Sequence, residues 1–144
     1  MILLDTTVLI YAVGADHRLR EPCRRTLELV RNGTVPATTT VEVVQEFAHV
    51  RARNTGRLDA ASLARWYAEG LGPLTRPDDD DLLEGLALLE EVDSLGAFDA
   101  VLGATARRRG WPVASADRAF GRIESLTHLD PASPTFVEEV LGVG

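Results

Sequence analysis

The chain has 144 residues, 45% of them hydrophobic, and a net charge of −7, which predicts one domain over residues 1–144 with a genuine core. All fifteen basic residues are arginine, so Schiff-base lysines and Walker-type phosphate loops are excluded. The single cysteine excludes an internal disulfide and a cage of thiolates around a metal.

The first half of the chain predicts short strands that alternate with helices. The expected elements are a strand at 2–4, a helix at 6–13, a loop at 14–20, a helix at 21–32, a strand at 34–38 and helices at 39–53 and 58–70. The helix at 21–32 ends in Asn32-Gly33, a typical stop. The helix at 39–53 starts with Thr39-x-x-Glu42, the capping-box pattern, which by itself accounts for Glu42.

The second half continues the alternation. The expected elements are a short strand at 72–76, helices at 77–92 and 98–110, a strand at 111–115, a turn at 117–120, a short strand at 125–129 and a helix at 133–142. Aspartates at 78–81 and arginines at 107–109 are interpreted as solvated helix ends whose charges suit the helix dipoles. Strands that alternate with helices predict an α/β fold, in which helices cover both faces of a parallel sheet.

Three carboxylates are expected at one edge of this sheet. Asp5 directly follows the first strand, and Asp117 follows the strand at 111–115 by two residues. Asp99 lies in the first turn of the helix that leads into that second strand. The carboxyl ends of parallel strands and the amino ends of the returning helices share one edge, where ligands bind. The three acids are therefore expected to converge.

Glu46 is a fourth candidate from the helix at 39–53. It lies seven residues past Thr39, about 10 Å along a helix, so it reaches the edge only if that helix tilts across it. Glu42 stands one turn earlier and is a geometric rival. Spacing alone leaves the choice between these two glutamates open.

A cluster of carboxylates without a cation repels itself. Mg²⁺ or Mn²⁺ removes that conflict because both ions prefer carboxylate and water oxygens. The hypothesis is that Asp5 is a metal ligand in a site that hydrolyses phosphodiesters. Each acid also has a plain structural interpretation, in which Asp5 and Asp99 stabilise helix starts and Asp117 is a turn residue. Convergence on one edge favours the metal site.

Four motifs resemble those of the PIN-domain ribonucleases, and among them those of VapC-like toxins of type II toxin–antitoxin pairs. They are LLDTTVLIY, TTVEVVQEF, FDAVLGATARRRG, and VASADRAFGRI followed by LTHLDP, and together they span nearly the whole chain. The resemblance implies a PIN-like three-layer α/β/α sandwich with a central, mainly parallel sheet. It also implies a metal-dependent endoribonuclease that acts as a toxin.

The resemblance assigns roles to individual residues. It implies four catalytic, metal-holding carboxylates, Asp5, Glu46, Asp99 and Asp117, and two supporting hydroxyls, Thr6 and Ser115. It thereby selects Glu46 over Glu42. Position 7 departs from the family, because it holds threonine where asparagine is common, and one hydroxyl has fewer donors and acceptors than an amide. The sequence therefore does not predict which hydrogen bonds the residue at position 7 makes around the site.

The implied cofactor is Mg²⁺ or Mn²⁺. The implied partners are an RNA substrate and a VapB-like antitoxin, with assembly as a homodimer or a toxin–antitoxin hetero-oligomer. Candidate contacts to the RNA backbone are Arg18, Arg20, Arg24 and Arg25, with a solvated helix face as the alternative interpretation of these arginines.

Cytoplasmic localisation is expected, without membrane association. No apolar run approaches the roughly 18 residues that span a bilayer, and the N-terminus lacks the basic start of a signal peptide. The alternative function is a catalytically inactive PIN-like module that binds RNA or a protein partner. A phosphatase of the haloacid dehalogenase type is disfavoured, because it requires a second aspartate at position 7.

Overall fold

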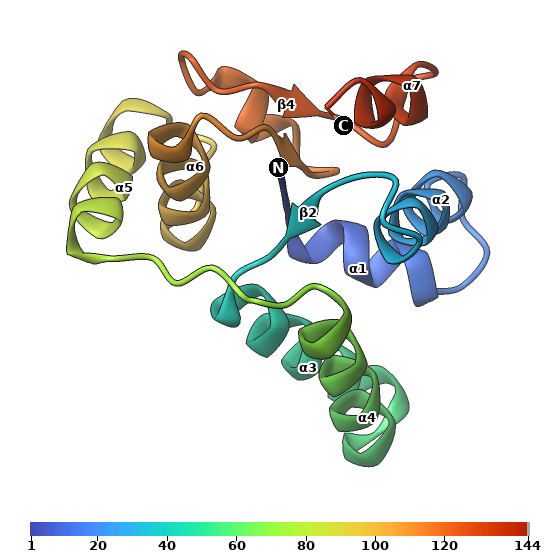
Figure 1. The fold of residues 1–144 in the computed structure, drawn as a ribbon. Helices are drawn as coiled ribbons and strands as arrows, with labels where there is room; N and C mark the ends of the chain where they lie inside the picture. Colours follow the sequence, from blue (N-terminus) through green and yellow to red (C-terminus); the bar gives the residue numbers. More distant parts are fainter. Residues whose placement is uncertain (144) are drawn as a thin grey trace.

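A sheet of four short parallel strands lies at the centre of the protein, of which a computed structural model describes residues 1–143 (Figure 1). The strands are β1 (Ile2–Leu4), β2 (Ala37–Thr38), β3 (Val113–Ala114) and β4 (His128–Leu129). They lie in the order β2-β1-β3-β4, and each pairing is parallel. Leu3 is in register with Thr38 on one side and with Val113 on the other. The first element of the chain is thus an inner strand.

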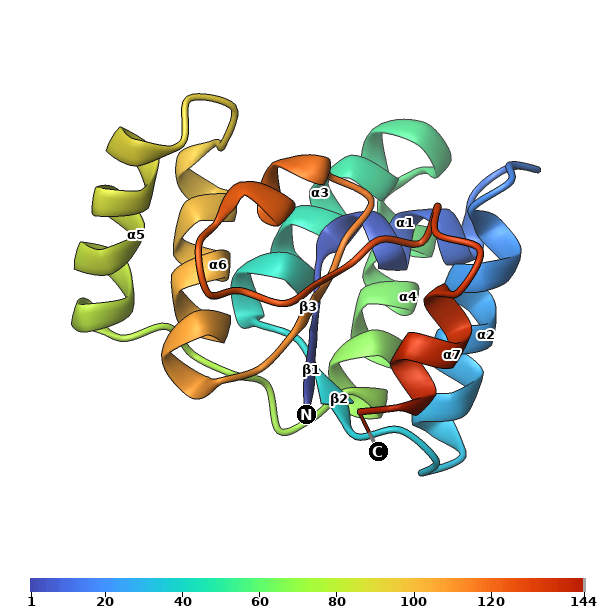
Figure 2. The ribbon, with the colours of Figure 1, turned by 90° about the horizontal axis from the view of Figure 1, so that it is seen from above.

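Helices cover both faces of this sheet. They are α1 (Thr6–Val13), α2 (Arg20–Arg31), α3 (Val41–Thr55), α4 (Arg57–Gly70), α5 (Asp79–Glu91), α6 (Ala97–Arg109) and α7 (Phe136–Leu141). Helices α5 and α6 pack together on one face, and α1, α2 and α7 lie on the other (Figures 1 and 2). The pair α3 and α4 lies below β2 in Figure 1. The α/β/α sandwich predicted from the sequence is confirmed.

The start of α3 differs from the expectation. Its N-cap is Thr40, whose hydroxyl accepts the Val43 N–H at 3.2 Å. The capping box predicted at Thr39 is therefore wrong. Thr39 instead donates its hydroxyl to the Leu4 carbonyl in the central strand, at 2.7 Å. Only this tertiary contact distinguishes the two neighbouring threonines. Glu42 therefore lacks the capping role predicted for it from the sequence.

Two shorter segments also differ from the prediction. Residues 72–76 form no strand and contribute a single bridge between Thr75 and Thr40. The turn predicted at 117–120 belongs to a 3-10 helix, η1 (Arg118–Arg122). As for membrane spans, none of the helices within residues 1–143 has the length and apolar character needed to cross a bilayer.

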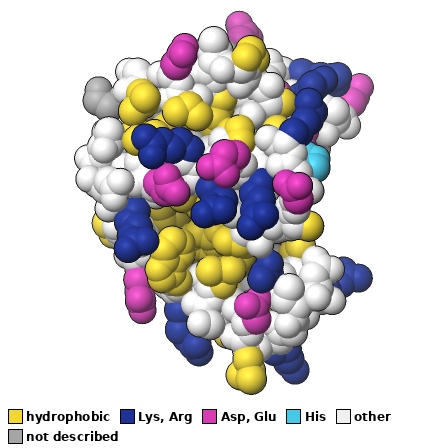
Figure 3. Space-filling view, turned by 90° about the vertical axis from the view of Figure 1, so that its right-hand side faces the viewer, with side chains coloured by type: hydrophobic (Ala, Val, Ile, Leu, Met, Phe, Trp, Pro, Cys, Tyr) yellow, Lys and Arg dark blue, Asp and Glu magenta, His cyan; other side chains and the backbone are white. Residues whose placement is uncertain are grey.

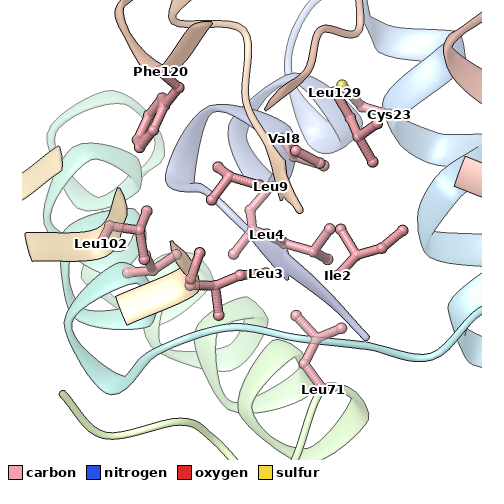
Figure 4. Close-up of a cluster of buried hydrophobic side chains, with 14 of the residues drawn as sticks. Ile2, Leu3, Leu4, Val8, Leu9, Cys23, Leu71, Leu102, Phe120 and Leu129 are labelled. Atoms are coloured by element: carbon pink, nitrogen blue, oxygen red, sulfur yellow. The ribbon is translucent and has the colours of Figure 1, made fainter. Parts of the chain in front are cut away.

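The core gathers around β1, whose three side chains are fully buried (Figure 4). Leu102 of α6 lies on one side of this strand and Cys23 of α2 on the other (Figure 4). Burial raises the pKa of the Cys23 thiol to about 12, so this cysteine is an inert core residue. Tyr67 of α4 donates its hydroxyl to the Leu9 carbonyl at 3.1 Å and so ties the α3–α4 pair to α1.

The aspartates at 78–81 and the arginines at 107–109 face each other across α5 and α6. Arg108 contacts Asp78 at 2.8 Å and Asp81 at 2.6 Å, and Arg109 contacts Asp81 at 3.0 Å. Asp81 is fully buried and forms a capping box with Asp78. The prediction of a solvated helix end is wrong for Asp81, because charges far apart in the sequence neutralise each other where the two helices pack.

The close approach of α5 to α6 depends on Gly85. A Cβ at this position would lie 2.7 Å from the Cα of Val101, and backbone cannot move aside as a side chain can. We expect Gly85→Ala to lower the free energy of unfolding by about 1–3 kcal/mol, although alanine favours a helix more than glycine does. Urea denaturation measures the change.

Gly70→Ala, at the end of α4, is the matched control. A Cβ there meets nothing within 4 Å, so this variant is expected to be neutral or slightly more stable than the wild type. Equal loss of stability in the two variants would contradict the packing argument.

Candidate active site

Asp5 lies at the carboxyl end of β1 and is only 2% exposed. Its Oδ2 accepts the hydroxyls of Thr7 and Ser115, both at 2.7 Å. The same oxygen accepts the Thr7 N–H at 3.3 Å, which makes Asp5 the N-cap of α1. Within residues 1–143 no side chain donates to Oδ1. The protein thus fixes one carboxylate oxygen and leaves the other for a ligand.

The hydroxyls of Thr7 and Ser115 join the ends of β1 and β3. Thr7 Oγ1 donates to Asp5 and accepts the Ala116 N–H at 2.9 Å. Ser115 Oγ donates to Asp5 and accepts the Asp117 N–H at 2.9 Å. Thr7 therefore both donates and accepts, as an amide side chain can. The sequence signal for this role is a hydroxyl two residues after an N-cap aspartate.

Glu46 reaches the same place from α3. The Thr6 hydroxyl, in the first turn of α1, donates to Glu46 Oε2. Of the two candidate glutamates, Glu46 is therefore the one whose carboxylate lies at the start of α1. Glu42, one turn earlier on α3, is exposed.

Asp99 and Asp117 complete the group from two further elements. Asp117 is the N-cap of η1, where its Oδ1 accepts the Ala119 N–H at 2.9 Å. Asp99 is the third residue of α6, and both carboxylates are partly buried. Figure 2 shows the starts of α1, α6 and η1 at one end of the strands, the edge predicted from the sequence.

Asp5, Glu46 and Asp117 lie close enough to Asp99 to act on it electrostatically. The pKa of Asp99 is raised to about 7, first by burial and then by the negative charges of the other three. No arginine within residues 1–143 forms an ion pair with any of the four. The cluster therefore holds an uncompensated negative charge.

The donor chemistry of the cluster fits a hard divalent cation. Such ions bind carboxylate and water oxygens. A cation would bind the free Oδ1 of Asp5 and would relieve the repulsion that the other carboxylates exert on Asp99. The geometry is looser than a closed coordination sphere. Across residues 1–143, no three acidic, histidine or cysteine side chains converge closely enough to hold one ion among them. A cation there would need waters to complete its shell.

The arginines expected to contact RNA lie on and next to α2. Arg20, Arg24 and Arg25 belong to α2, and Arg18 to the loop before it. Arg25 pairs with Glu28 at 3.2 Å, and the Nε of Arg20 is buried without a hydrogen-bond partner among the described residues. In that same part of the chain, no hydrogen bond joins these four arginines to the four carboxylates.

A second surface feature is a groove between α2 and α4, called here the α2–α4 groove. Its lining combines apolar residues with charges of both signs: Ala12, Val13, Arg24, Leu27, Glu28, Val30, Arg31, Trp66, Tyr67, Gly70 and Leu71. Trp66 is 47% exposed, and Figure 3 shows an apolar hollow bordered by arginine side chains. Exposed apolar surface with a charged rim is typical of a surface that binds another protein.

Comparison with known proteins matches the PIN domain family over residues 2–126. The chain is 44% identical over 133 residues to ribonuclease VapC7 of Mycobacterium tuberculosis (strain ATCC 25618 / H37Rv), covering 91% of this chain and 92% of that protein. It is 35% identical over 113 residues to ribonuclease VapC23 of the same strain, covering 76% of this chain and 86% of that protein.

Two solved structures share the fold. One is VapBC2 from Rickettsia felis bound to a DNA fragment from their promoter, with a TM-score of 0.72 and 16% identity, covering 90% of this chain and 98% of that chain. The other is FitAcB from Neisseria gonorrhoeae, with a TM-score of 0.70 and 19% identity, covering 91% of this chain and 98% of that chain. At these identities, the likeness concerns the arrangement of strands and helices.

Proposed function

The chain belongs to the PIN domain family, and we propose that it is a divalent-metal-dependent endoribonuclease that acts as the toxin of a toxin–antitoxin pair. The observation that carries the proposal is the cluster of four carboxylates on four elements, with a raised pKa at Asp99 and no paired arginine within the described residues. Two relatives at 44% and 35% identity are named as ribonucleases. We take residues 1–144 as one PIN domain.

Each residue of the site has a distinct task in this proposal. Asp5 and Asp99 chiefly hold Mg²⁺ or Mn²⁺, with help from Glu46 and Asp117. When bound, the ion would supply an activated water and stabilise charge on the phosphodiester.

The hydroxyls keep these carboxylates in place. Ser115 and Thr7 fix the Oδ2 of Asp5 and leave Oδ1 for the metal ion, and Thr6 orients Glu46. Such supporting hydrogen bonds set the direction of a metal ligand and its basicity.

The proposed regulator is a VapB-like antitoxin. The α2–α4 groove suits an amphipathic helix of such a partner, because apolar side chains line it and Arg24, Arg31 and Glu28 offer charged partners to polar residues of that helix. The two solved structures that share the fold are those of VapBC2 and FitAcB. A homodimer or a toxin–antitoxin hetero-oligomer follows as the proposed assembly, in the cytoplasm. The four arginines Arg18, Arg20, Arg24 and Arg25 stay candidates for RNA contacts.

The direct test is cleavage of total RNA by the purified protein. With Mg²⁺ or Mn²⁺ we expect discrete fragments that carry a 5′-phosphate, since an activated water attacks the phosphorus and the 3′-oxygen leaves. Removal of the metal with EDTA is expected to abolish cleavage, and added Mn²⁺ to restore it.

Two outcomes would overturn the proposal. Cleavage that persists in EDTA would rule out the metal-dependent mechanism. No cleavage in either metal, with the fold intact by circular dichroism, would identify the chain as a PIN-like module that binds RNA or a protein without cutting.

A further inference from the structure

A small apolar pocket lies beside the carboxylate cluster. It has a volume of about 200 Å³ and is lined by Thr40, Glu42, Pro77, Phe98, Val101 and Leu102. Two of these residues lie close in sequence to the cluster. Phe98 directly precedes Asp99, and Glu42 lies one helical turn before Glu46 on α3. Residues four apart share one face of a helix, with Cβ atoms roughly 5–6 Å apart. The pocket and the site are therefore neighbours along both helices.

Glu42 is the one charged residue that lines the pocket, and its carboxylate has no partner among the described residues. Glu42 is exposed and makes no ion pair or hydrogen bond through its side chain with any residue of 1–143. Because Thr40 caps α3, Glu42 has no part in a capping box either. Glu42, whose carboxylate only accepts hydrogen bonds, thus lines the same pocket as the aromatic residue Phe98.

We infer that this pocket receives one base of single-stranded RNA next to the bond that is cut, and that guanine is the preferred base. The inference rests on the proposed ribonuclease function and adds a specificity site to it. Proteins recognise RNA sequence mainly in single strands, where unstacked bases lie on aromatic rings and are read along their hydrogen-bonding edges. The pocket brings together an aromatic residue and a hydrogen-bonding group, each on a helix that also carries a carboxylate of the cluster.

The choice of guanine follows from the chemistry of Glu42. A carboxylate has two acceptor oxygens and no donor. Guanine alone presents two adjacent donors, N1–H and the N2 amino group, on its Watson–Crick edge. Cytosine and adenine each present one amino group next to a ring acceptor, and uracil presents one N–H between two carbonyls. These three bases would place an acceptor against the carboxylate, which disfavours them.

The test uses a pool of RNA with random bases on both sides of the cut, digested in Mn²⁺ and sequenced. The wild type is expected to prefer guanine at one position next to the cut. Glu42→Gln is expected to reduce that preference about tenfold, because an amide can donate to the other bases. Glu69→Gln, an exposed glutamate on α4, is the matched control and should keep the wild-type profile.

A second variant tests the aromatic wall. Phe98→Leu keeps an apolar side chain and is expected to weaken cleavage of all sequences about tenfold through KM, with melting temperature and metal dependence retained. If the wild type cuts RNA and both variants keep its base profile and KM, the pocket inference is wrong and the ribonuclease function stands. If the wild type cuts no RNA in either metal, the proposed function fails and this inference with it.

Discussion

Replacing Asp99 with asparagine is expected to lower RNA cleavage at least about 100-fold and, at the same time, to stabilise the metal-free protein. Loss of residues that merely support metal ligands costs 10- to 100-fold, and Asp99 is proposed as a ligand itself. Asparagine keeps the size of the side chain but removes its negative charge. The initial rate of cleavage in Mn²⁺ measures the first effect.

The gain in stability has a defined sign and pH range. The pKa of Asp99 in the fold is about 7, above the usual value near 3.9, so the fold disfavours its charged form. This penalty is absent below about pH 4 and grows until the pH reaches about 7. A shift of this size corresponds to at most about 4 kcal/mol, and solvent screening of this partly exposed side chain reduces it. In EDTA we therefore expect Asp99→Asn to exceed the wild type by about 2 kcal/mol at pH 8, and to match it at pH 4.

A matched control separates the site from charge in general. Asp16→Asn removes an exposed charge from the loop before α2 and is expected to change neither cleavage nor stability. Mn²⁺ should raise the melting temperature of the wild type and of Asp16→Asn, because a ligand bound only by the folded state stabilises it. Wild-type cleavage by Asp99→Asn would contradict its assignment as a ligand.

Replacing Asp81 with alanine is expected to lower the free energy of unfolding by about 3 kcal/mol at pH 7. Asp81 is fully buried and contacts both Arg108 and Arg109. It also accepts the Asp78 N–H at 3.0 Å in the capping box of α5. Asp80→Ala is the control, because Asp80 is exposed and contacts only Arg108, at 3.2 Å, and exposed pairs contribute less than about 1 kcal/mol.

The loss at Asp81 should depend on pH. Burial alone would raise the pKa of this carboxyl, but hydrogen bonds from Arg109, the Asp78 backbone and Arg108 outweigh it and hold the pKa below its usual value. A carboxylate of lowered pKa contributes stability above about pH 4 and loses that contribution as the pH falls through its folded-state pKa. Urea denaturation should therefore show a larger difference from the wild type at pH 7 than at pH 2, and a constant difference would contradict this account.

The edge of the sheet at which the site lies could be predicted because it follows from chain order. Asp5 and Asp117 each follow a parallel strand, and Asp99 opens a helix, so the topology alone sends all three to one edge. The choice of Glu46 over Glu42 needed more than spacing. It depends on how α3 crosses the start of α1, where the Thr6 hydroxyl donates to Glu46.

Other features could not be predicted because they depend on contacts between distant residues. Thr39 and Thr40 are the same residue type side by side, and only the Leu4 carbonyl, in another strand, decides which of them caps α3. The prediction that Asp81 lies at a solvated helix end was wrong for the same reason. Its partners Arg108 and Arg109 come from another helix, and no local pattern shows that the two charged runs meet.

The span between Asp5 and Ser115 has a consequence for protein synthesis. Their hydrogen bond joins residues 110 positions apart, and β1 gains its second neighbour only when β3 exists. At 5–20 residues per second, a ribosome needs about 5 to 20 s to make that stretch. A nascent chain therefore carries Asp5 long before it carries the serine that orients it and the aspartate that follows. If the site cuts RNA, a nascent chain that ends before Ser115 lacks two groups of that site, and cutting is not expected until β3 and η1 have been made.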